Sequence, residues 1–235
     1  VQMGQSLVSL ATGLIGLWLV FSHTTELNGW TRPELLAVMG IHILMGGVIQ
    51  SAIQPNMDRL MGEIQDGTLD FALTKPADAQ ALVSMREFRL WQLTDVLVGF
   101  IVLFVAVYQY QGAVGVWQSL GFAAALGMGG VLVYCFWLML TSTAFWVVRV
   151  DYMINLFQGL YAAGRYPVGI YPRWLKTGLT FLVPVAFAVT VPAEALTSRL
   201  TPLALLGTLG LTLLFIILAR LVWRLGLRNY SGASA

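Results

Sequence analysis

Charged residues are scarce in this sequence. Only 10% of its 235 residues are Asp, Glu, Lys or Arg, whereas 58% are hydrophobic. An ordinary soluble domain carries roughly 25% charged residues, and a soluble fold of this size could not bury so much apolar surface. The composition therefore excludes a soluble enzyme and a disordered chain. It predicts an all-α integral membrane protein, and the net charge of +2 gives no indication of nucleic-acid binding.

Other absences restrict the chemistry. Cys135 is the sole cysteine, which excludes an intramolecular disulfide and a cysteine metal cluster. Lys75 and Lys176 are the only lysines, and neither stands in a Walker A pattern, so the chain lacks the P-loop route to ATP hydrolysis. We expect no catalytic residue, no metal site and no cofactor. No basic region precedes the first apolar run, so no signal peptide is indicated, and we expect the natural N-terminus to lie upstream of Val1.

Six apolar runs are long enough to cross a bilayer, which takes about 20 residues. The last run but one contains Pro184 and Pro192. Because proline removes a backbone donor, we expect this fifth span to be broken, as a shorter crossing with re-entrant or interfacial helices. We predict a single membrane domain over 1–228 and a disordered tail over 229–235. The predicted spans are 3–21, 35–53, 91–108, 120–140, 175–196 and 203–222.

The basic residues predict the orientation. Of the 13, only Arg32 and Arg199 fall outside three segments, and these segments would all lie on one side of a six-span bundle. Cytoplasmic loops are enriched in Lys and Arg, so both termini and the segments 54–89 and 141–176 are predicted to be cytoplasmic. Within 141–176 we expect a helical continuation over 144–159, and then a non-helical Gly164–Pro172 stretch that redirects the chain or contacts a partner. Glycines such as Gly46, Gly47, Gly129, Gly130, Gly207 and Gly210 are expected to let helices approach closely.

The segment 54–89 contains six of the 11 acidic residues. Met57, Leu60, Met61 and Ile64 recur at helical spacing and predict an amphipathic helix. Gly67 follows where a helix-ending glycine is expected, Thr68 or Asp70 is expected to cap a second short helix, and Pro76 closes it. Two interpretations stay open here, a solvated loop and a docking surface for a soluble partner.

The run Gly67-Thr68-Leu69-Asp70, followed by Leu73, Lys75 and Pro76, resembles a family signature. It is similar to the six-span permease subunits of bacterial ABC type-2 exporters, in which an Ile-Arg-x-Gly-Thr-Leu-Asp run is followed by a Leu-x-x-Pro-like ending. Gln65 stands where that pattern has arginine. Asn28-Gly29-Trp30 and the Pro-rich stretches over 165–193 resemble other parts of the same family.

The resemblance implies a dimeric permease in the bacterial inner membrane, made of two copies or of two related permeases. It also implies two separate ATPase subunits, which bind the coupling helices between spans two and three. The coupling residues it implies are Met57, Leu60, Glu63, Asp66, Gly67, Thr68, Leu69, Asp70, Leu73 and Pro76.

Three polar residues are candidates for a translocation path: His42, Gln50 and Asp95. Polar groups at membrane depth face protein or a cavity. For His42 we favour an interhelical hydrogen bond over a role in the path, and Asp95 is expected to pair with Arg89 or to face water. The alternative function is a self-contained channel or ion-coupled carrier for a small or amphipathic solute. A carrier would require an intramembrane acid or histidine relay, which the spans lack.

Overall fold

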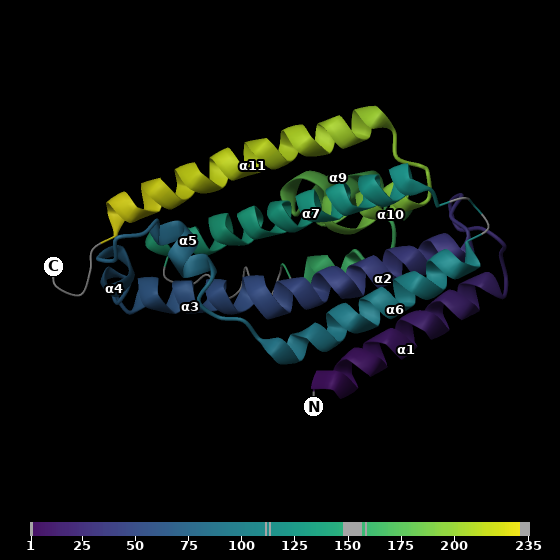
Figure 1. The fold of residues 1–235 in the computed structure, drawn as a ribbon, viewed down its shortest axis with the longest axis horizontal. Helices are drawn as coiled ribbons and strands as arrows, with labels where there is room; N and C mark the ends of the chain where they lie inside the picture. Colours follow the sequence, from purple (N-terminus) through teal and green to yellow (C-terminus); the bar gives the residue numbers. More distant parts are fainter. Residues whose placement is uncertain (1, 111, 113, 148–156, 158, 231–235) are drawn as a thin grey trace.

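The computed structural model describes residues 2–110, 112, 114–147, 157 and 159–230. The described residues are helical apart from turns, loops and one isolated bridge between Leu27 and Trp30. Figure 1 shows long helices running side by side, with some short helices at one end of the bundle and others beside the long helices in its other half. The α-helices are α1 (Gln2–Phe21), α2 (Arg32–Val48), α3 (Gln54–Gln65), α4 (Asp70–Leu73), α5 (Ala79–Ser84), α6 (Leu93–Gln109), α7 (Val116–Ser142), α9 (Arg173–Thr177), α10 (Val191–Leu196) and α11 (Pro202–Asn229).

Short 3-10 and π-helical turns extend several of these helices. A π-helical turn joins α2 to α3, and a 3-10 turn precedes α6. Another 3-10 turn follows α7, and π-helical turns lie beside α9 and α10. In chain order, the 3-10 and π-helical turns are Ile49–Ile53, Leu90–Gln92, Thr143–Phe145, Val168–Ile170, Gly178–Leu182 and Ala186–Thr190.

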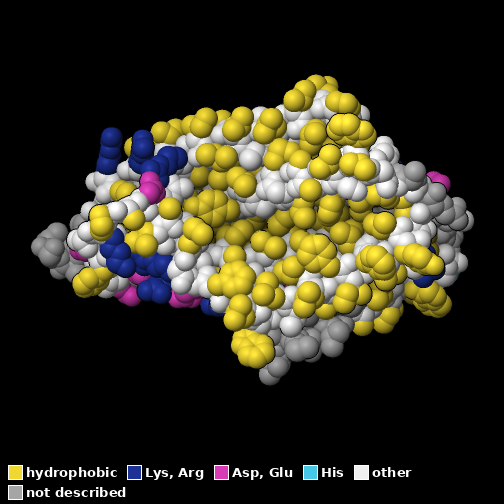
Figure 2. Space-filling model, viewed as in Figure 1, with side chains coloured by type: hydrophobic (Ala, Val, Ile, Leu, Met, Phe, Trp, Pro, Cys, Tyr) yellow, Lys and Arg dark blue, Asp and Glu magenta, His cyan; other side chains and the backbone are white. Residues whose placement is uncertain are grey.

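Four helical segments among the described residues are long and apolar enough to cross a membrane: Arg32–Gln65, Leu90–Gln109, Val116–Phe145 and Pro202–Asn229. They coincide with the predicted second, third, fourth and sixth spans, and α1 coincides with the predicted first. The all-α prediction is thereby confirmed, while the count of six crossings stays a prediction. Figure 2 shows charged side chains gathered at one end of the molecule and an apolar surface over most of the rest of this face.

We call the end formed by α3, α4, α5 and the last turns of α11 the charged end, and the other the opposite end. At the opposite end, Asn28 and Gly29 have φ of 51° and 78°, and the Leu27 and Trp30 backbones exchange two hydrogen bonds of 3.0 Å. This is the Asn-Gly turn that closes a two-residue hairpin. It joins α1 to α2.

α2 and α6 pack most closely, and glycines make this possible. A methyl group at Gly99 would lie 2.5 Å from the Leu44 backbone nitrogen. One at Gly47 would lie 2.7 Å from the Val96 nitrogen, and one at Gly40 would lie 2.8 Å from the Leu103 nitrogen. At these three glycines the backbone of one helix therefore lies directly against the backbone of the other, as in other closely packed membrane helices.

After α7 the chain returns along α2. The Tyr161 hydroxyl donates to the His42 carbonyl at 2.8 Å, and the Asn28 side chain donates to the Gly169 carbonyl at 3.0 Å. The Gly164–Pro172 stretch is non-helical apart from one 3-10 turn, as predicted. It lies at the opposite end, however, although the sequence placed it with the charged segments. Most of the predicted 144–159 helix, including Arg149, is outside the described residues.

Residues 173–196 begin and finish in the half of the bundle near the opposite end. The Tyr110 hydroxyl donates to the Thr197 carbonyl at 3.0 Å, and Lys176 interacts electrostatically with Glu194. Helical structure is interrupted at 183–184, where Val183 has an extended backbone and Pro184 follows. Residues 173–196 thus turn back on themselves, and we call them the re-entrant segment. A fifth crossing of the membrane stays a prediction.

An ion pair joins this re-entrant segment to α2. Arg199 donates to both carboxylate oxygens of Glu34 at 2.8 Å and to the Gly29 carbonyl at 2.6 Å. Glu34 is only 4% exposed, and it also accepts from the Thr31 backbone at 2.7 Å. The pair thus fixes the start of α2 to the end of α10.

We predict that neighbouring glycines of α7 differ sharply in their tolerance of a methyl group. At Gly129 it would lie 2.6 Å from the Phe187 carbonyl oxygen, whereas at Gly130 nothing lies within 4 Å. Gly129→Ala is expected to lower the free energy of unfolding by about 1–3 kcal/mol, because a packed backbone has to shift. Thermal unfolding in detergent measures this, with Gly130→Ala as the matched control. Equal stability of the two variants would contradict the packing of α7 on residues 186–190.

We also predict the side on which residue 169 lies. In a Cys135→Ala background, single cysteines replace Gly169, Val116 or Lys75. A membrane-impermeant maleimide applied to intact cells should give residues 169 and 116 the same accessibility and residue 75 the opposite one. If residue 169 behaves like residue 75, the loop assignment made from the basic residues holds and the path of the chain described above does not.

Candidate functional site

The candidate site begins on α3, which continues α2 through the π-helical turn without a break. Met57, Leu60 and Ile64 form the predicted apolar stripe and are 0%, 1% and 8% exposed. They are buried inside this chain, where α3 packs against α7 and α5. Met57 and Leu60 therefore position α3 in the structure and present no surface to a partner.

Gly67 ends α3 as predicted. It has φ of 68°, a conformation that suits glycine. The Thr68 nitrogen donates to the Glu63 carbonyl at 2.9 Å, and the Gly67 nitrogen donates to the Ile64 carbonyl at 3.4 Å. These are the two hydrogen bonds of a Schellman motif. The motif turns the chain sharply from α3 into α4.

The start of α4 differs from the prediction. Leu69 occupies the N-cap position without a side-chain hydrogen bond, so neither Thr68 nor Asp70 is the cap. The Leu69 nitrogen donates instead to the hydroxyl of Tyr230, at 3.0 Å. Burial raises the pKa of this tyrosine, with Asp70 as a further cause. Leu69 itself is 0% exposed. The end of α11 thus holds the turn between α3 and α4.

The remaining predicted coupling residues lie on or near a single exposed surface. Phe71, in the middle of α4, is 77% exposed. It lies within the predicted second short helix but is not among the coupling residues that the resemblance implies. The sequence feature that could have identified Phe71 is a large aromatic residue inside an otherwise charged, turn-rich segment. We define the tip surface as Asp66, Thr68, Asp70, Phe71, Leu73 and Pro76, of which all but the half-buried Asp70 are exposed.

Glu63 is engaged within the chain. Arg86 Nη1 donates to its two carboxylate oxygens at 2.6 and 2.7 Å. Arg59 Nε donates to Glu63 at 3.0 Å, and Arg59 Nη1 reaches Glu87 at 3.2 Å. The result is a partly buried network that connects α3 to the segment before α6. Glu63 therefore stabilises the site and is not free to bind a partner.

Asn56 lies at the centre of this connection and is 2% exposed. Its Nδ2 donates to the carbonyls of Ala52 and Glu87 at 2.7 and 2.8 Å. Its Oδ1 accepts from the backbone nitrogens of Arg86 and Glu87 at 2.8 and 2.9 Å. All four hydrogen-bonding positions of the amide are used. The loop after α5 is thereby fixed to α3.

α5 is held by α7 and α11. The Asp78 side chain caps it by accepting from the Ala81 nitrogen at 3.1 Å. Asp78 also pairs with Arg220, which lowers the pKa of its carboxyl group to about 2. Ser84 shares a 2.8 Å hydrogen bond with the Tyr134 hydroxyl of α7.

An aromatic cluster holds the ends of α7 and α11 together. The Phe145 ring meets those of Trp223 and Tyr230 edge to face, with centroids 5.9 and 6.0 Å apart. Gly226 gives the ring its space, since a methyl group there would lie 2.2 Å from Phe145. This cluster supports Tyr230 where it binds Leu69.

The three candidate path residues lie apart along α2 and α6. His42 stacks on Tyr161 with ring centroids 4.6 Å apart. The interhelical hydrogen bond at His42 uses its backbone carbonyl, while its Nδ1 is buried with no hydrogen-bond partner among the described residues. Gln50 is exposed and lines a cavity. Asp95 is 9% exposed in the first turn of α6, and no ion pair within the described residues joins it to Arg89.

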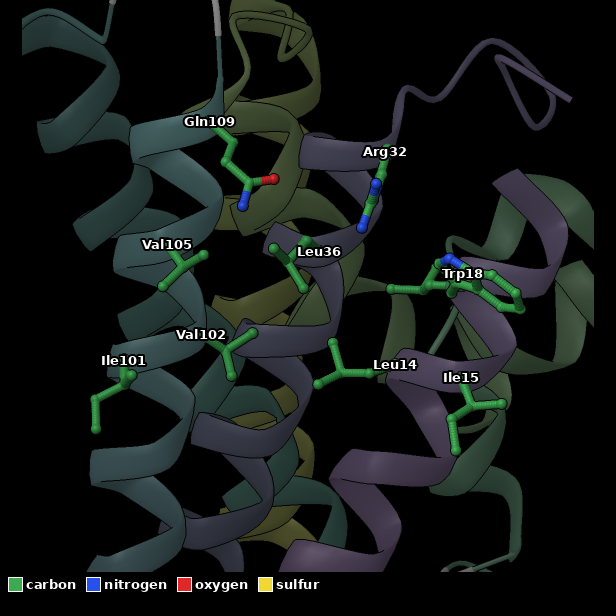
Figure 3. A pocket seen from close by; sticks show the side chains of 10 residues that line it. Leu14, Ile15, Trp18, Arg32, Leu36, Ile101, Val102, Val105 and Gln109 are labelled. Carbon is green, nitrogen blue, oxygen red and sulfur yellow. The ribbon is translucent and has the colours of Figure 1, made fainter. Parts of the chain in front are cut away.

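A second cavity, of about 480 Å³, lies between α1, α2 and α6. Figure 3 shows apolar side chains from these helices around it, with Arg32 and Gln109 toward one end. Its walls are almost entirely hydrophobic, and it contains none of the predicted path residues.

A family model of ABC-2 family transporter proteins matches residues 7–234. The chain belongs to the ABC-2 transporter family. It is a membrane protein of that family, and the resemblance seen around Gly67 to Asp70 is confirmed. Proteins of this family are the membrane subunits of their transporters. No curated protein and no solved structure matches the chain.

We predict that Asn56→Ala destabilises the charged end of this ABC-2 family member by roughly 2–4 kcal/mol. The substitution leaves the amide nitrogens of Arg86 and Glu87 and the Glu87 carbonyl without partners, and a buried unpaired group costs about 1–3 kcal/mol. Hydrogen exchange read by mass spectrometry should show faster exchange over residues 85–90. Asn229→Ala, which removes one exposed hydrogen bond to the Leu225 carbonyl, is the control. Unchanged exchange in Asn56→Ala would contradict the role assigned to the amide.

Proposed function

We propose that the chain is the permease subunit of an ATP-binding-cassette exporter and that separate ATPase subunits bind its tip surface. The observation that carries this proposal is the exposure of Phe71 at the charged end of a membrane protein, on a helix whose neighbouring residues are fixed. Large exposed aromatic residues among polar ones are typical of protein–protein interfaces. The tip surface thus offers an apolar anchor with Asp66, Thr68 and Asp70 around it.

The rigidity of the support is the second argument. The tip surface follows α3, and α3 is one continuous helix with α2. Tyr230, Asn56 and the Glu63 network attach it to α11 and to the segment before α6. A displacement of the tip surface by a partner would therefore move at least two long membrane helices. In this proposal the buried side chains of Met57, Leu60 and Leu69 transmit force from the tip surface to the rest of the chain. Gly67 sets the angle of the turn between α3 and α4.

The orientation and assembly follow from the same proposal. ATP is available in the cytoplasm, so the charged end faces the cytoplasm of a bacterial inner membrane, with the C-terminus on that side. A second permease, identical or related, completes the path with two ATPase subunits. The absence of a P-loop pattern from this chain agrees with ATP hydrolysis on a partner. His42, Gln50 and Asp95 stay candidates for the path.

We predict that Phe71→Glu abolishes copurification of the ATPase subunit and ATP-dependent transport. The substitution removes the apolar anchor and adds a negative charge that Asp66 and Asp70 repel. Phe71→Ala should weaken copurification at least tenfold. Met85→Glu is the matched control, because Met85 is 85% exposed at the same end but outside the tip surface. Both variants should insert at wild-type levels. Copurification that is unaffected by either Phe71 variant would contradict docking at the tip surface.

A further inference from the structure

A polar cavity of about 360 Å³ lies beside the π-helical turn that joins α2 to α3. Ligand sites typically have volumes of roughly 300–1,000 Å³. π-helical turns are rare in proteins, and those that occur are often found at functional sites. The lining residues come from four parts of the chain, namely α2 with its π-helical turn and the start of α3, the segment that leads into α6, α7, and the positions Phe157 and Tyr161.

The charge of this cavity is positive. Among the described residues, Arg89 is the only charged one in its lining, and three glutamines, Gln50, Gln54 and Gln92, supply amide groups. Asp58 interacts electrostatically with Arg89 and accepts a hydrogen bond from Gln54. Within the described residues no carboxylate forms an ion pair with Arg89. A guanidinium with nearby amide donors is the arrangement that binds phosphate or carboxylate groups.

Trp137 provides a second, independent indication of a ligand. This residue lines the cavity and is 0% exposed. Its indole Nε1–H is buried without a hydrogen-bond partner among the described residues. Its ring lies edge to face with Phe157, with centroids 4.8 Å apart. A buried donor without a partner is costly, and an acceptor oxygen in the cavity would satisfy it.

One side of the cavity is apolar. Ile49, Phe157 and the ring of Tyr161 face it beside the small residue Gly46. The Tyr161 hydroxyl is already used by the His42 carbonyl, so this side offers mainly hydrophobic contact. A ligand that satisfies both sides carries an anionic group and an apolar chain.

We propose that this cavity binds the anionic head group of an amphipathic molecule, with Arg89 pairing the anion and Trp137 donating to one of its oxygens. The inference rests on the proposed function and names a substrate class for it, an amphipathic phosphate or carboxylate. Gln92, which is 5% exposed, supplies a further hydrogen bond from the floor of the site.

The site is connected to the segment that carries the tip surface. The Arg89 nitrogen donates to the Ser51 carbonyl of the π-helical turn at 2.9 Å. Two residues earlier, the backbone of Glu87 is held by Asn56 of α3. A head group bound by the Arg89 side chain would therefore act on the segment that is hydrogen-bonded to the π-helical turn and to α3.

The test measures binding to the purified full chain in a neutral detergent by native mass spectrometry. The probe is dodecyl phosphate, compared with inorganic phosphate and with dodecyltrimethylammonium, which has the same chain and the opposite charge. We expect saturable binding of one dodecyl phosphate, at least tenfold tighter than either comparison compound. Arg89→Gln and Trp137→Phe should each weaken it, the former at least tenfold. Arg89 is itself exposed, and Arg224→Gln removes the same charge from another exposed position at the same end, outside the cavity, and should leave binding unchanged.

Several outcomes would overturn the proposal. Equal affinities in Arg89→Gln and Arg224→Gln would place the anion elsewhere. If dodecyltrimethylammonium bound as tightly as dodecyl phosphate, the binding would be hydrophobic association only. If inorganic phosphate bound as tightly, the apolar dodecyl chain would contribute nothing. Because the assay needs no ATPase, its failure is distinct from a failure of docking at the tip surface. In the complex with the ATPase, dodecyl phosphate should change ATP hydrolysis in the wild type and not in Arg89→Gln.

Discussion

The burial of the α3 apolar stripe is the interaction on which the rest of the charged end depends. Met57 and Leu60 are 0% and 1% exposed. Burying a side chain of this size contributes about 1.5–3 kcal/mol to the free energy of unfolding. This burial holds α3 in line with α2, so that a single helix extends from the opposite end to the charged end. The Schellman turn at Gly67 and the short helix α4 then stand at a fixed place beyond it.

Polar contacts add to the stabilisation that this hydrophobic contact gives to the charged end. Asn56 uses every hydrogen-bonding position of its amide, three of them on the segment before α6 and one on the Ala52 carbonyl, and Glu63 binds two arginines. Exposed ion pairs contribute little to stability, but these groups are partly or fully buried, where leaving one partner unpaired is costly. Acidic residues of this segment thus differ in role. Glu63 holds the fold through its partly buried network, and Asp78 caps α5 and forms an exposed ion pair with Arg220. Asp66 and Asp70 border the exposed Phe71.

Local patterns in the sequence predicted the long helices, the helix end at Gly67 and the family, because each depends on neighbouring residues. Two features depend on contacts far apart in the chain and could not be predicted in this way. The amphipathic stripe of α3 gave no indication whether its partner was another protein or α7. The side assigned to residues 164–172 assumed that 175–196 crosses the membrane, whereas Pro184 allows the chain to turn back.

That difference also changes the electrostatic argument for orientation. Counting basic residues placed Lys176 at the charged end, but it interacts with Glu194 near the re-entrant segment at the opposite end. The difference in basic residues between the two ends is therefore smaller than the sequence implied. What still distinguishes the charged end is where its arginines lie, since Arg59, Arg86, Arg89 and Arg220 gather around α3 and α5. Arg59, Arg86 and Arg220 form ion pairs with carboxylates. Arg89 lines the polar cavity and forms no ion pair among the described residues, so it is the one of these four arginines that we assign to an anionic ligand.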